Sequence, residues 1–168
     1  MYRVAVVTVS DKGARGERED LSGQAIKEML EANNWQVEQS LIVNDDPGAI
    51  SGVLLDLVGA GMELVLTTGG TGFGPRDNTP EATLSVIERE VPGFSEAMRM
   101  ETMKISPRAI LSRGVAGIRG RTLIINLPGS QKAVRECLAV ILPVLEHGLA
   151  TLTGKSSECG SVTEGHGS

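Results

Sequence analysis

A glycine-rich segment, Thr68-Gly69-Gly70-Thr71-Gly72, follows the apolar run at residues 64–66. Glycines placed after a strand let the backbone turn sharply and bring its amides close to an anion without interfering side chains. The two threonine hydroxyls add hydrogen-bond donors. The segment lacks the Gly-Lys-Ser/Thr ending of a Walker A loop and the spacing of the dinucleotide-binding fingerprint. It predicts a loop that holds a phosphate-bearing ligand, and a plain tight connection is the alternative.

An arginine and an aspartate, Arg76 and Asp77, follow the glycines just before Thr79-Pro80, which is typical of a helix start with a threonine cap. Arginine binds anions, and a carboxylate is a ligand that Mg²⁺ prefers. Two plainer roles stay open at this point. Asp77 is also placed to cap the following helix, and Arg76 is also consistent with a solvent-exposed side chain.

A pair of acidic residues, Asp45-Asp46, follows another predicted strand. Asp46 directly precedes Pro47, so we expect it to cap the helix that begins there, which leaves Asp45 for the site. Two carboxylates from neighbouring strand ends suit Mg²⁺ bound with a nucleoside triphosphate, because this ion takes few carboxylates and keeps room for water and phosphate. We therefore predict Asp45 and Asp77 as the catalytic residues and as the magnesium ligands.

Strands alternate with helices along the chain. Hydrophobic patterning predicts strands at 4–9, 35–43, 64–66, 115–118 and 122–127, and helices at 22–34, 47–58, 80–91, 94–104 and from 130 onward. Such alternation predicts a three-layer α/β fold, with a mostly parallel sheet covered by helices on both faces. We expect one domain over residues 1–153 and a flexible polar tail over 154–168.

Ligands of such sheets bind beyond the carboxyl ends of the strands. Four segments rich in small or acidic residues stand at predicted strand ends: Ser10-Asp11, Asn44-Asp45-Asp46, Gly69-Gly70-Thr71-Gly72 and Asn126-Leu127-Pro128-Gly129. We expect these segments to converge at one edge of the sheet, where they form the walls of a ligand site.

The composition argues against several classes of protein. The chain has 168 residues, of which 40% are hydrophobic and 22% charged, and its formal net charge is −5. This is a globular balance, and the acidic surplus argues against nucleic acid as the main partner. Two cysteines and two histidines give no zinc-ligand spacing. No apolar run approaches the roughly 20 residues of a membrane span, and the N-terminus is typical of a first strand rather than a signal peptide, so we expect a cytoplasmic protein without a membrane partner.

Longer motifs extend these short signals. They are Leu66-Thr67-Thr68-Gly69-Gly70-Thr71-Gly72 with Asp77, Pro75-Arg76-Asp77-Asn78-Thr79-Pro80-Glu81-Ala82-Thr83, Glu88-Arg89-Glu90-Val91-Pro92-Gly93, Leu111-Ser112-Arg113 with Ala116-Gly117-Ile118-Arg119-Gly120, and Asn126-Leu127-Pro128-Gly129. In this order and spacing they resemble the molybdopterin adenylyltransferases, a family of molybdenum-cofactor biosynthesis proteins that includes one domain of gephyrin. The resemblance spans the chain from Val4 to about Leu152, and it implies the molybdopterin-binding fold of that family.

The resemblance implies transfer of AMP from Mg-ATP to the terminal phosphate of molybdopterin, with release of pyrophosphate. It also implies Mg²⁺ as cofactor, a homotrimer, and a molybdate-insertion protein that receives the product. A related enzyme of the same fold with another nucleotide or pterin is one alternative, and a non-catalytic molybdopterin-binding paralogue or scaffold is another. Asp45 and Asp77 match the two functional aspartates of the family, and Ser112 matches a serine of its pterin pocket. The expected substrate-binding positions are Ser10, Asp11, Thr68, Gly69, Gly70, Thr71, Gly72, Arg76, Ser112, Asn126, Pro128 and Gly129.

The sequence departs from the family at the turn that carries Asp45. Family members usually have proline where this chain has Asn44, and glutamate where it has Asp46. Without the proline the turn is less rigid, so the orientation of Asp45 depends on contacts that the sequence does not reveal.

Overall fold

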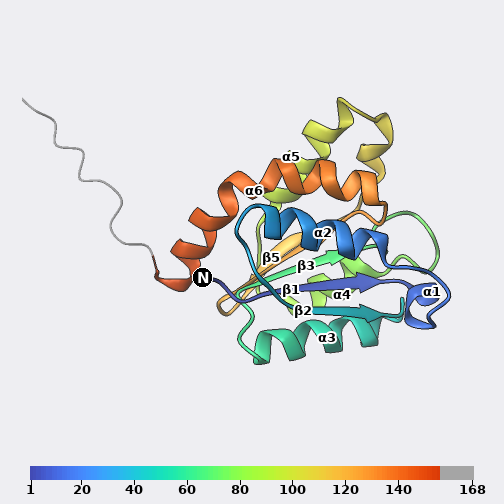
Figure 1. Ribbon diagram of the computed structural model, residues 1–168. Helices are drawn as coiled ribbons and strands as arrows, with labels where there is room; N and C mark the ends of the chain where they lie inside the picture. The colour runs from blue at the N-terminus through green and yellow to red at the C-terminus, as the bar shows by residue number, and fades with distance from the viewer. Residues whose placement is uncertain (156–168) are drawn as a thin grey trace, which may run out of the picture.

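A six-stranded sheet forms the centre of the protein in the computed structural model, which describes residues 1–155 (Figure 1). The strands are β1 (Val4–Val9), β2 (Val37–Val43), β3 (Leu64–Thr68), β4 (Arg89–Glu90), β5 (Ala116–Arg119) and β6 (Thr122–Leu127). Their order in the sheet is β2-β1-β3-β6-β5-β4. β1, β2, β3 and β6 run parallel, whereas β5 is antiparallel to β6 and β4 is antiparallel to β5. The predicted mostly parallel sheet is confirmed.

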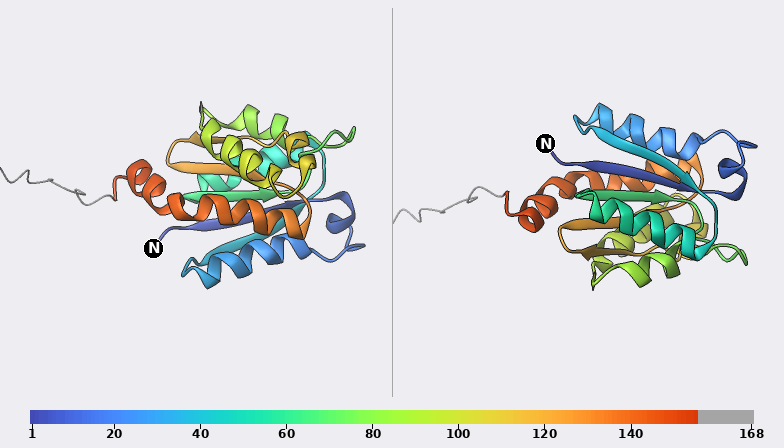
Figure 2. Two further views of the ribbon diagram at one scale, coloured as in Figure 1. Left: turned by 90° about the horizontal axis from the view of Figure 1, so that it is seen from above. Right: turned by 90° about the horizontal axis from the view of Figure 1, so that it is seen from below.

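Helices cover both faces of this sheet. They are α1 (Asp11–Ala14), α2 (Leu21–Ala32), α3 (Pro47–Gly59), α4 (Thr79–Val86), α5 (Pro92–Met103), the 3₁₀ helix η1 (Pro107–Leu111) and α6 (Gln131–Thr153). Figure 2 shows α2, α5 and α6 on one face, and α3 with α4 on the other. In the first layer Val6 shares a buried cluster with Ile26 and Leu138, and in the second Val7 shares one with Leu54. The expected three-layer α/β architecture is confirmed.

The central strands β1, β3 and β6 are buried along their whole length. Successive side chains of a strand point to opposite faces, and both faces are covered here, so these strands are mostly apolar. The register pairs Thr8 of β1 with Thr68 of β3, and Thr68 with Leu127 of β6. The carboxyl ends of the three strands therefore lie side by side, and the loops that follow them meet at one edge.

The predicted helix over 80–91 is wrong in its second half. α4 ends at Val86, and the chain continues into β4. The amide of Glu88 donates to a carbonyl oxygen of β5 at 2.8 Å. A Cβ atom at Gly117 of β5 would lie 2.7 Å from the carbonyl oxygen of Arg89, so glycine permits this close approach. Pairing with β5 therefore outweighs the helical spacing of the apolar residues.

Three smaller elements differ from expectation. The loop after β1 contains the short helix α1, and η1 follows α5 where only a break was predicted. α5 begins at Pro92 rather than Phe94, because proline is favourable in the first turn of a helix, where its missing amide costs nothing.

The long helix α6 is part of the hydrophobic core. By length and apolar composition alone it meets the criteria for a membrane-crossing helix. Its side chains at Val134, Leu138 and Leu145 are completely buried in the cluster beneath α2 and α5. The helix that meets the length and composition criteria for a membrane span is therefore one whose apolar face packs on the sheet.

The end of α6 is attached to the start of the sheet. Gly154 adopts the left-handed conformation of a helix cap, with φ of 70°. The ammonium group of Lys155 pairs with the Glu63 carboxylate at 2.6 Å and lies 4.9 Å from the centre of the Tyr2 ring. The first two positions of the predicted flexible tail are thus in contact with the domain, and residues 156–168 lie outside the part that the structure describes.

Candidate active site

Two cavities open at the carboxyl edge of the parallel strands. The first, here called the acidic cavity, has a volume of about 530 Å³ and is lined by Asp20, Asp45 and Asp77 among others. The second, here called the α5–α6 cavity, has a volume of about 470 Å³ and is lined by residues of α5, η1 and α6 together with Ser112. The loops predicted to converge therefore do so, but they form two compartments rather than one.

A shared wall, made of residues 69–72 and 128–129, separates the cavities. Gly69-Gly70 lines the acidic cavity, whereas Thr71-Gly72 lines the α5–α6 cavity. The loop after β6 is divided in the same way, because Pro128 lines the α5–α6 cavity and Gly129 the acidic one. A hydrogen bond of 2.6 Å from the Thr68 hydroxyl to the Pro128 carbonyl joins the two loops.

The structure brings most of the predicted site residues to one of these cavities. Those in the acidic cavity are Ser10, Asp45, Thr68, Gly69, Gly70, Asp77 and Gly129. Those in the α5–α6 cavity are Thr71, Gly72, Ser112, Asn126 and Pro128. Asp11 and Arg76 line neither cavity: Asp11 exchanges hydrogen bonds with Asp45, and Arg76 binds the Asp11 carboxylate.

The glycine segment has a backbone that other residues adopt at a cost. Gly69 and Gly70 have φ of +94° and +68°. A Cβ atom at Gly69 would lie 2.5 Å from the carbonyl oxygen of Val9, which is backbone and has no room to move. The Thr79 hydroxyl donates to the carbonyl of Gly69 at 2.8 Å, and the amide of Thr79 donates to the carbonyl of Gly70 at 3.1 Å. Within residues 1–155, the amides at positions 70–72 donate to no protein acceptor, as expected of a loop whose amides bind an anion.

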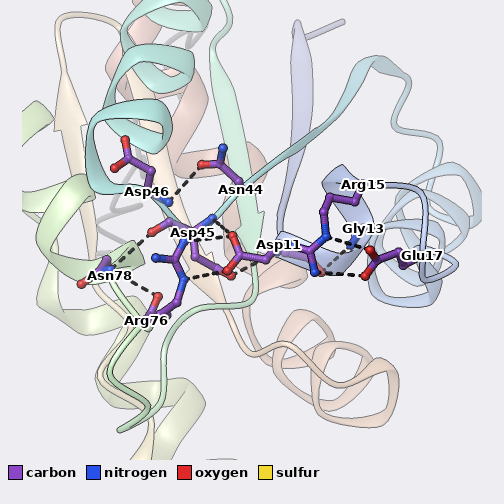
Figure 3. A network of polar contacts seen from close by, with 10 residues as sticks. Asp11, Gly13, Arg15, Glu17, Asn44, Asp45, Asp46, Arg76 and Asn78 are labelled. Carbon is purple, nitrogen blue, oxygen red and sulfur yellow. Dashed lines mark hydrogen bonds and ion pairs between the residues drawn. The ribbon is translucent and has the colours of Figure 1, made fainter.

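Asp11, Asp45 and Arg76 form one network at the end of β1 and β2 (Figure 3). The amide of Asp11 donates to Asp45 Oδ2 at 3.1 Å, and the amide of Asp45 donates to Asp11 Oδ1 at 3.0 Å. Arg76 binds the same Asp11 carboxylate with Nε at 2.7 Å and Nη2 at 3.0 Å. The Arg76 side chain is 62% exposed, so it is both solvent-facing, as in the plainer interpretation, and engaged in the network.

The two carboxylates of this network differ in their tendency to bind a proton. The Arg76 guanidinium, helped by the amide of Asp45, holds the pKa of Asp11 well below its usual range. Burial raises the pKa of Asp45, and the neighbouring Asp11 carboxylate adds to the rise. Asp11 therefore keeps its negative charge most readily. The charged form of Asp45 would be stabilised by a cation bound beside it in the acidic cavity.

Asp46 and Asp77 were both placed to cap a helix, and only Asp46 does so. Asp46 accepts from the amide of Ala49 at 2.9 Å and caps α3, as predicted. Asp77 does not cap α4: its Oδ2 accepts from the amide of Gly74 at 2.9 Å, and α4 has no side-chain cap at all. The predicted threonine cap is also wrong, because the Thr79 hydroxyl donates into the glycine segment instead.

Asn44 stands where the family usually has proline, and its side chain holds the turn before α3 by a hydrogen bond. Its Oδ1 accepts from the amide of Asp46 at 3.0 Å. The Asn78 side chain donates to the carbonyl of Asp45 at 3.3 Å. Together with the bond between the Asp45 amide and Asp11, these contacts fix the backbone that carries Asp45.

The carboxylates of the acidic cavity fit Mg²⁺ bound together with phosphates. Asp45 and Asp77 each use Oδ2 to accept from an amide, and within the described residues Oδ1 of each has no protein donor. Asp20 is different, since both of its oxygens accept hydrogen bonds, from Thr8 and Gly23. Residues 1–155 contain no group of three His, Cys, Asp or Glu side chains that would bind a metal by themselves. Two free carboxylate oxygens suit an ion that keeps most of its coordination for water and phosphate.

Asn126 is held by the protein itself. It is only 2% exposed. Its Nδ2 donates to the hydroxyls of Thr67 and Thr83 at 2.9 Å each, and its Oδ1 accepts from the amide of Val115 at 3.1 Å. The side chain predicted to bind substrate thus joins β3, α4 and the start of β5 beneath the α5–α6 cavity.

Several arginines of the site were not predicted, and two of them hold its backbone. Arg113 donates from Nε to the carbonyl of Gly72 at 2.8 Å and from Nη2 to the carbonyl of Asp77 at 2.8 Å. Arg99 donates from Nη1 to the carbonyls of Ser112 and Gly114, at 3.3 and 3.1 Å. Arg113 stands inside one of the motifs that carry the family resemblance, which was the available signal, whereas Arg99 has none.

Comparisons with known proteins show the family to which the chain is related. Residues 5–147 match the family model described as a probable molybdopterin binding domain. The chain is 43% identical over 155 residues to a molybdopterin adenylyltransferase of Helicobacter pylori, covering 90% of this chain and 88% of that protein. It is 38% identical to gephyrin of Dictyostelium discoideum, covering 97% of this chain but 24% of that protein.

Two solved structures show the same fold. The molybdopterin biosynthesis enzyme MoaB of Thermus thermophilus is 52% identical, with a TM-score of 0.87, covering 94% of this chain and 100% of that one. The Mog protein of Mycobacterium ulcerans is 37% identical, with a TM-score of 0.85, covering 90% and 99% of the two chains. The chain therefore belongs to the molybdopterin-binding domain family of molybdenum cofactor biosynthesis proteins.

Proposed function

We propose that this protein transfers the adenylyl group of Mg-ATP to the terminal phosphate of molybdopterin and releases pyrophosphate. The observation that carries the proposal is the pair of cavities that meet at the shared wall. A transfer between two bound molecules requires that their reacting atoms be held next to each other, and two neighbouring cavities provide a place for each molecule. The similarity to molybdopterin adenylyltransferases supports the identity of the two substrates.

The chemistry of each cavity suggests which substrate it holds. The acidic cavity offers Asp45 and Asp77, the residues expected to hold Mg²⁺, so we assign the triphosphate of ATP to it. The α5–α6 cavity has apolar side chains such as Met98 and Leu111 with Arg108 and Lys132 nearby. Apolar walls with a few cations suit a flat heterocycle that ends in a phosphate, so we assign molybdopterin to this cavity.

The reaction requires positioning and charge neutralisation rather than a covalent nucleophile on the protein. An oxygen of the molybdopterin phosphate attacks the α-phosphorus of ATP, and the bond from that phosphorus to the bridging oxygen of pyrophosphate breaks. The free amides at positions 70–72 are placed to hold phosphate oxygens on the shared wall. When bound, Mg²⁺ supplies neutralisation of the negative charge on the triphosphate and the leaving pyrophosphate.

Incubation of the protein with molybdopterin and Mg-ATP tests this function. We expect adenylylated molybdopterin and pyrophosphate to accumulate in equal amounts, and to be absent when Mg²⁺ is chelated. Tight binding of molybdopterin without either product would support the alternative of a binding paralogue or scaffold, and it would exclude the enzyme.

The family resemblance also leads us to propose a cytoplasmic homotrimer that delivers its product to a molybdate-insertion protein. Light scattering of the purified protein measures the molar mass directly. A mass three times that of the 17.7 kDa chain is the expected result, and a monomer would contradict the proposed assembly without affecting the proposed reaction.

A further inference from the structure

Arg113 contacts the segment between β3 and α4 at three points and α4 itself at a fourth. Its amide donates to the carbonyl of Thr71 at 2.9 Å, and its Nε donates to the carbonyl of Gly72 at 2.8 Å. Its Nη2 donates to the carbonyl of Asp77 at 2.8 Å, and its Nη1 pairs with the carboxylate of Glu81 in α4. One residue thus fixes the shared wall, the backbone of Asp77 and the start of α4 relative to one another.

The position of Arg113 links the two cavities without lining either of them. Its chain neighbours Ser112 and Gly114 line the α5–α6 cavity, and their carbonyls are held by Arg99 of α5. The side chain reaches in the other direction, to the backbone of Asp77, whose carboxylate belongs to the acidic cavity. A shift of Arg113 would therefore move groups of both cavities.

The contacts need an arginine. The guanidinium group donates to three separate acceptors in a rigid, planar arrangement, and its side chain is only 34% exposed. A lysine ammonium keeps the charge, but it is a compact donor on a flexible stem and cannot span these acceptors together. Charge alone would not preserve the arrangement.

We propose that Arg113 is a positioning residue for adenylyl transfer, an inference that rests on the proposed function. It holds the shared wall and Asp77 so that the phosphates bound in the two cavities meet in line. Because Arg113 lines neither cavity, its loss is expected to slow the transfer step far more than it weakens the binding of either substrate.

The test uses Arg113→Lys and Arg113→Met in the full chain. The transfer rate is measured in a single turnover, and the dissociation constants of molybdopterin and of a non-hydrolysable Mg-ATP analogue are measured separately. We expect the rate to fall about 100-fold, as a misplacement near 1 Å does elsewhere, while each dissociation constant changes by less than about threefold. Glu81→Gln, which weakens only one of the anchors, is expected to lower the rate by a smaller factor.

A matched control is Arg119→Met. Arg119 donates from Nη1 to the carbonyl of Val86 at 2.9 Å, so it also links an arginine to α4, but at the end remote from the shared wall. We expect this variant to keep the transfer rate of the unchanged protein, and to lower the unfolding temperature less than Arg113→Met does, because it removes one hydrogen bond rather than three side-chain contacts. A purely structural role would not lower the transfer rate while leaving both dissociation constants nearly unchanged.

Two results would overturn the role of Arg113. One is a rate in Arg113→Lys equal to that of Arg119→Met, and the other is a rise in either dissociation constant as large as the fall in rate. Both require an active unchanged protein, which distinguishes them from failure of the proposed function. If the unchanged protein forms no adenylylated molybdopterin, the proposed function fails and the role of Arg113 in transfer fails with it.

Discussion

Asp11 and Asp45 exchange hydrogen bonds, each carboxylate accepting from the backbone amide of the other residue at 3.0–3.1 Å. The exchange joins the loops after β1 and β2, and it places two carboxylates side by side. Arg76 binds only Asp11 of the two with its side chain. Arg76 therefore balances the negative charge of Asp11. Oδ1 of Asp45 has no protein donor within the described residues.

Asp45→Asn is expected to stabilise the protein and to remove its activity. The asparagine Oδ1 can still accept from the amide of Asp11, and the substitution removes a partly buried carboxylate beside a like charge. We expect the free energy of unfolding at pH 7 to rise by about 0.5–1 kcal/mol, and the transfer rate to fall at least about 100-fold. Urea denaturation and the transfer assay measure the two effects. A less stable variant would contradict this account of Asp45, and Asp46→Asn, which keeps a helix cap, is the control.

Asp11 is expected to make the protein sensitive to acid. Its pKa is lowered in the folded state, so its contribution to stability is present above the ordinary Asp pKa of about 4 and is lost as the pH falls toward the folded-state value. Asp45 acts in the opposite direction, because its raised pKa favours the folded state at low pH and this contribution is lost as pH rises.

The experiment compares urea midpoints of the unchanged protein and Asp11→Asn between pH 2.5 and 7. We expect the unchanged protein to be more stable above about pH 5, and the difference to shrink steadily as the pH falls below 4. Arg76→Met is expected to show the same dependence. A difference that is constant with pH would show that the ion pair is not its source.

Asp77→Asn is expected to abolish transfer and to leave the fold intact. The amide oxygen of asparagine can accept from the amide of Gly74, as Oδ2 of Asp77 does now at 2.9 Å. The charge available to a magnesium ion is lost, and we expect the transfer rate to fall at least about 100-fold. Circular dichroism and the unfolding temperature check the fold. A variant with full activity would remove Asp77 from the proposed reaction.

Gly69→Ala is expected to destabilise the protein by about 2–4 kcal/mol, because the left-handed backbone is strained with a side chain and the added Cβ meets the carbonyl of Val9. Gly148→Ala is the control: Gly148 lies inside α6, and an added Cβ there meets no other atom within 4 Å. We expect this control to gain about 0.5–1 kcal/mol from the higher helix propensity of alanine. Equal effects of the two substitutions would contradict the close packing of the shared wall.

The sequence predicted best what is decided within a few residues. The cap formed by Asp46 needs only the following turn of helix, and the glycine segment is determined by its own backbone. The strands β1, β3 and β6 are buried on both faces, so their apolar runs could hardly be mistaken.

What could not be predicted depends on contacts between distant parts of the chain. Residues 87–91 have the apolar spacing of a helix, and only pairing with β5 makes them extended. Arg113 reaches Gly72 across 41 positions of sequence, and nothing local to either residue indicates the bond. Asn126 lines the α5–α6 cavity, and the buried hydroxyls of β3 and α4 that take both of its amide hydrogens are not indicated by the sequence around it. The division of the site into two cavities is a property of packing that the motifs alone do not contain.

The attachment of Lys155 to Glu63 and Tyr2 has a practical meaning for how the domain can be combined with other polypeptides. Both ends of the described chain lie at the amino edge of the sheet (Figure 1). The cavities open at the opposite edge, where the parallel strands end. A fluorescent protein, a surface anchor or a second enzyme joined directly before Met1 or after Lys155 would begin at the edge of the sheet opposite the openings. Fusion at these two positions is therefore expected to leave both cavities accessible.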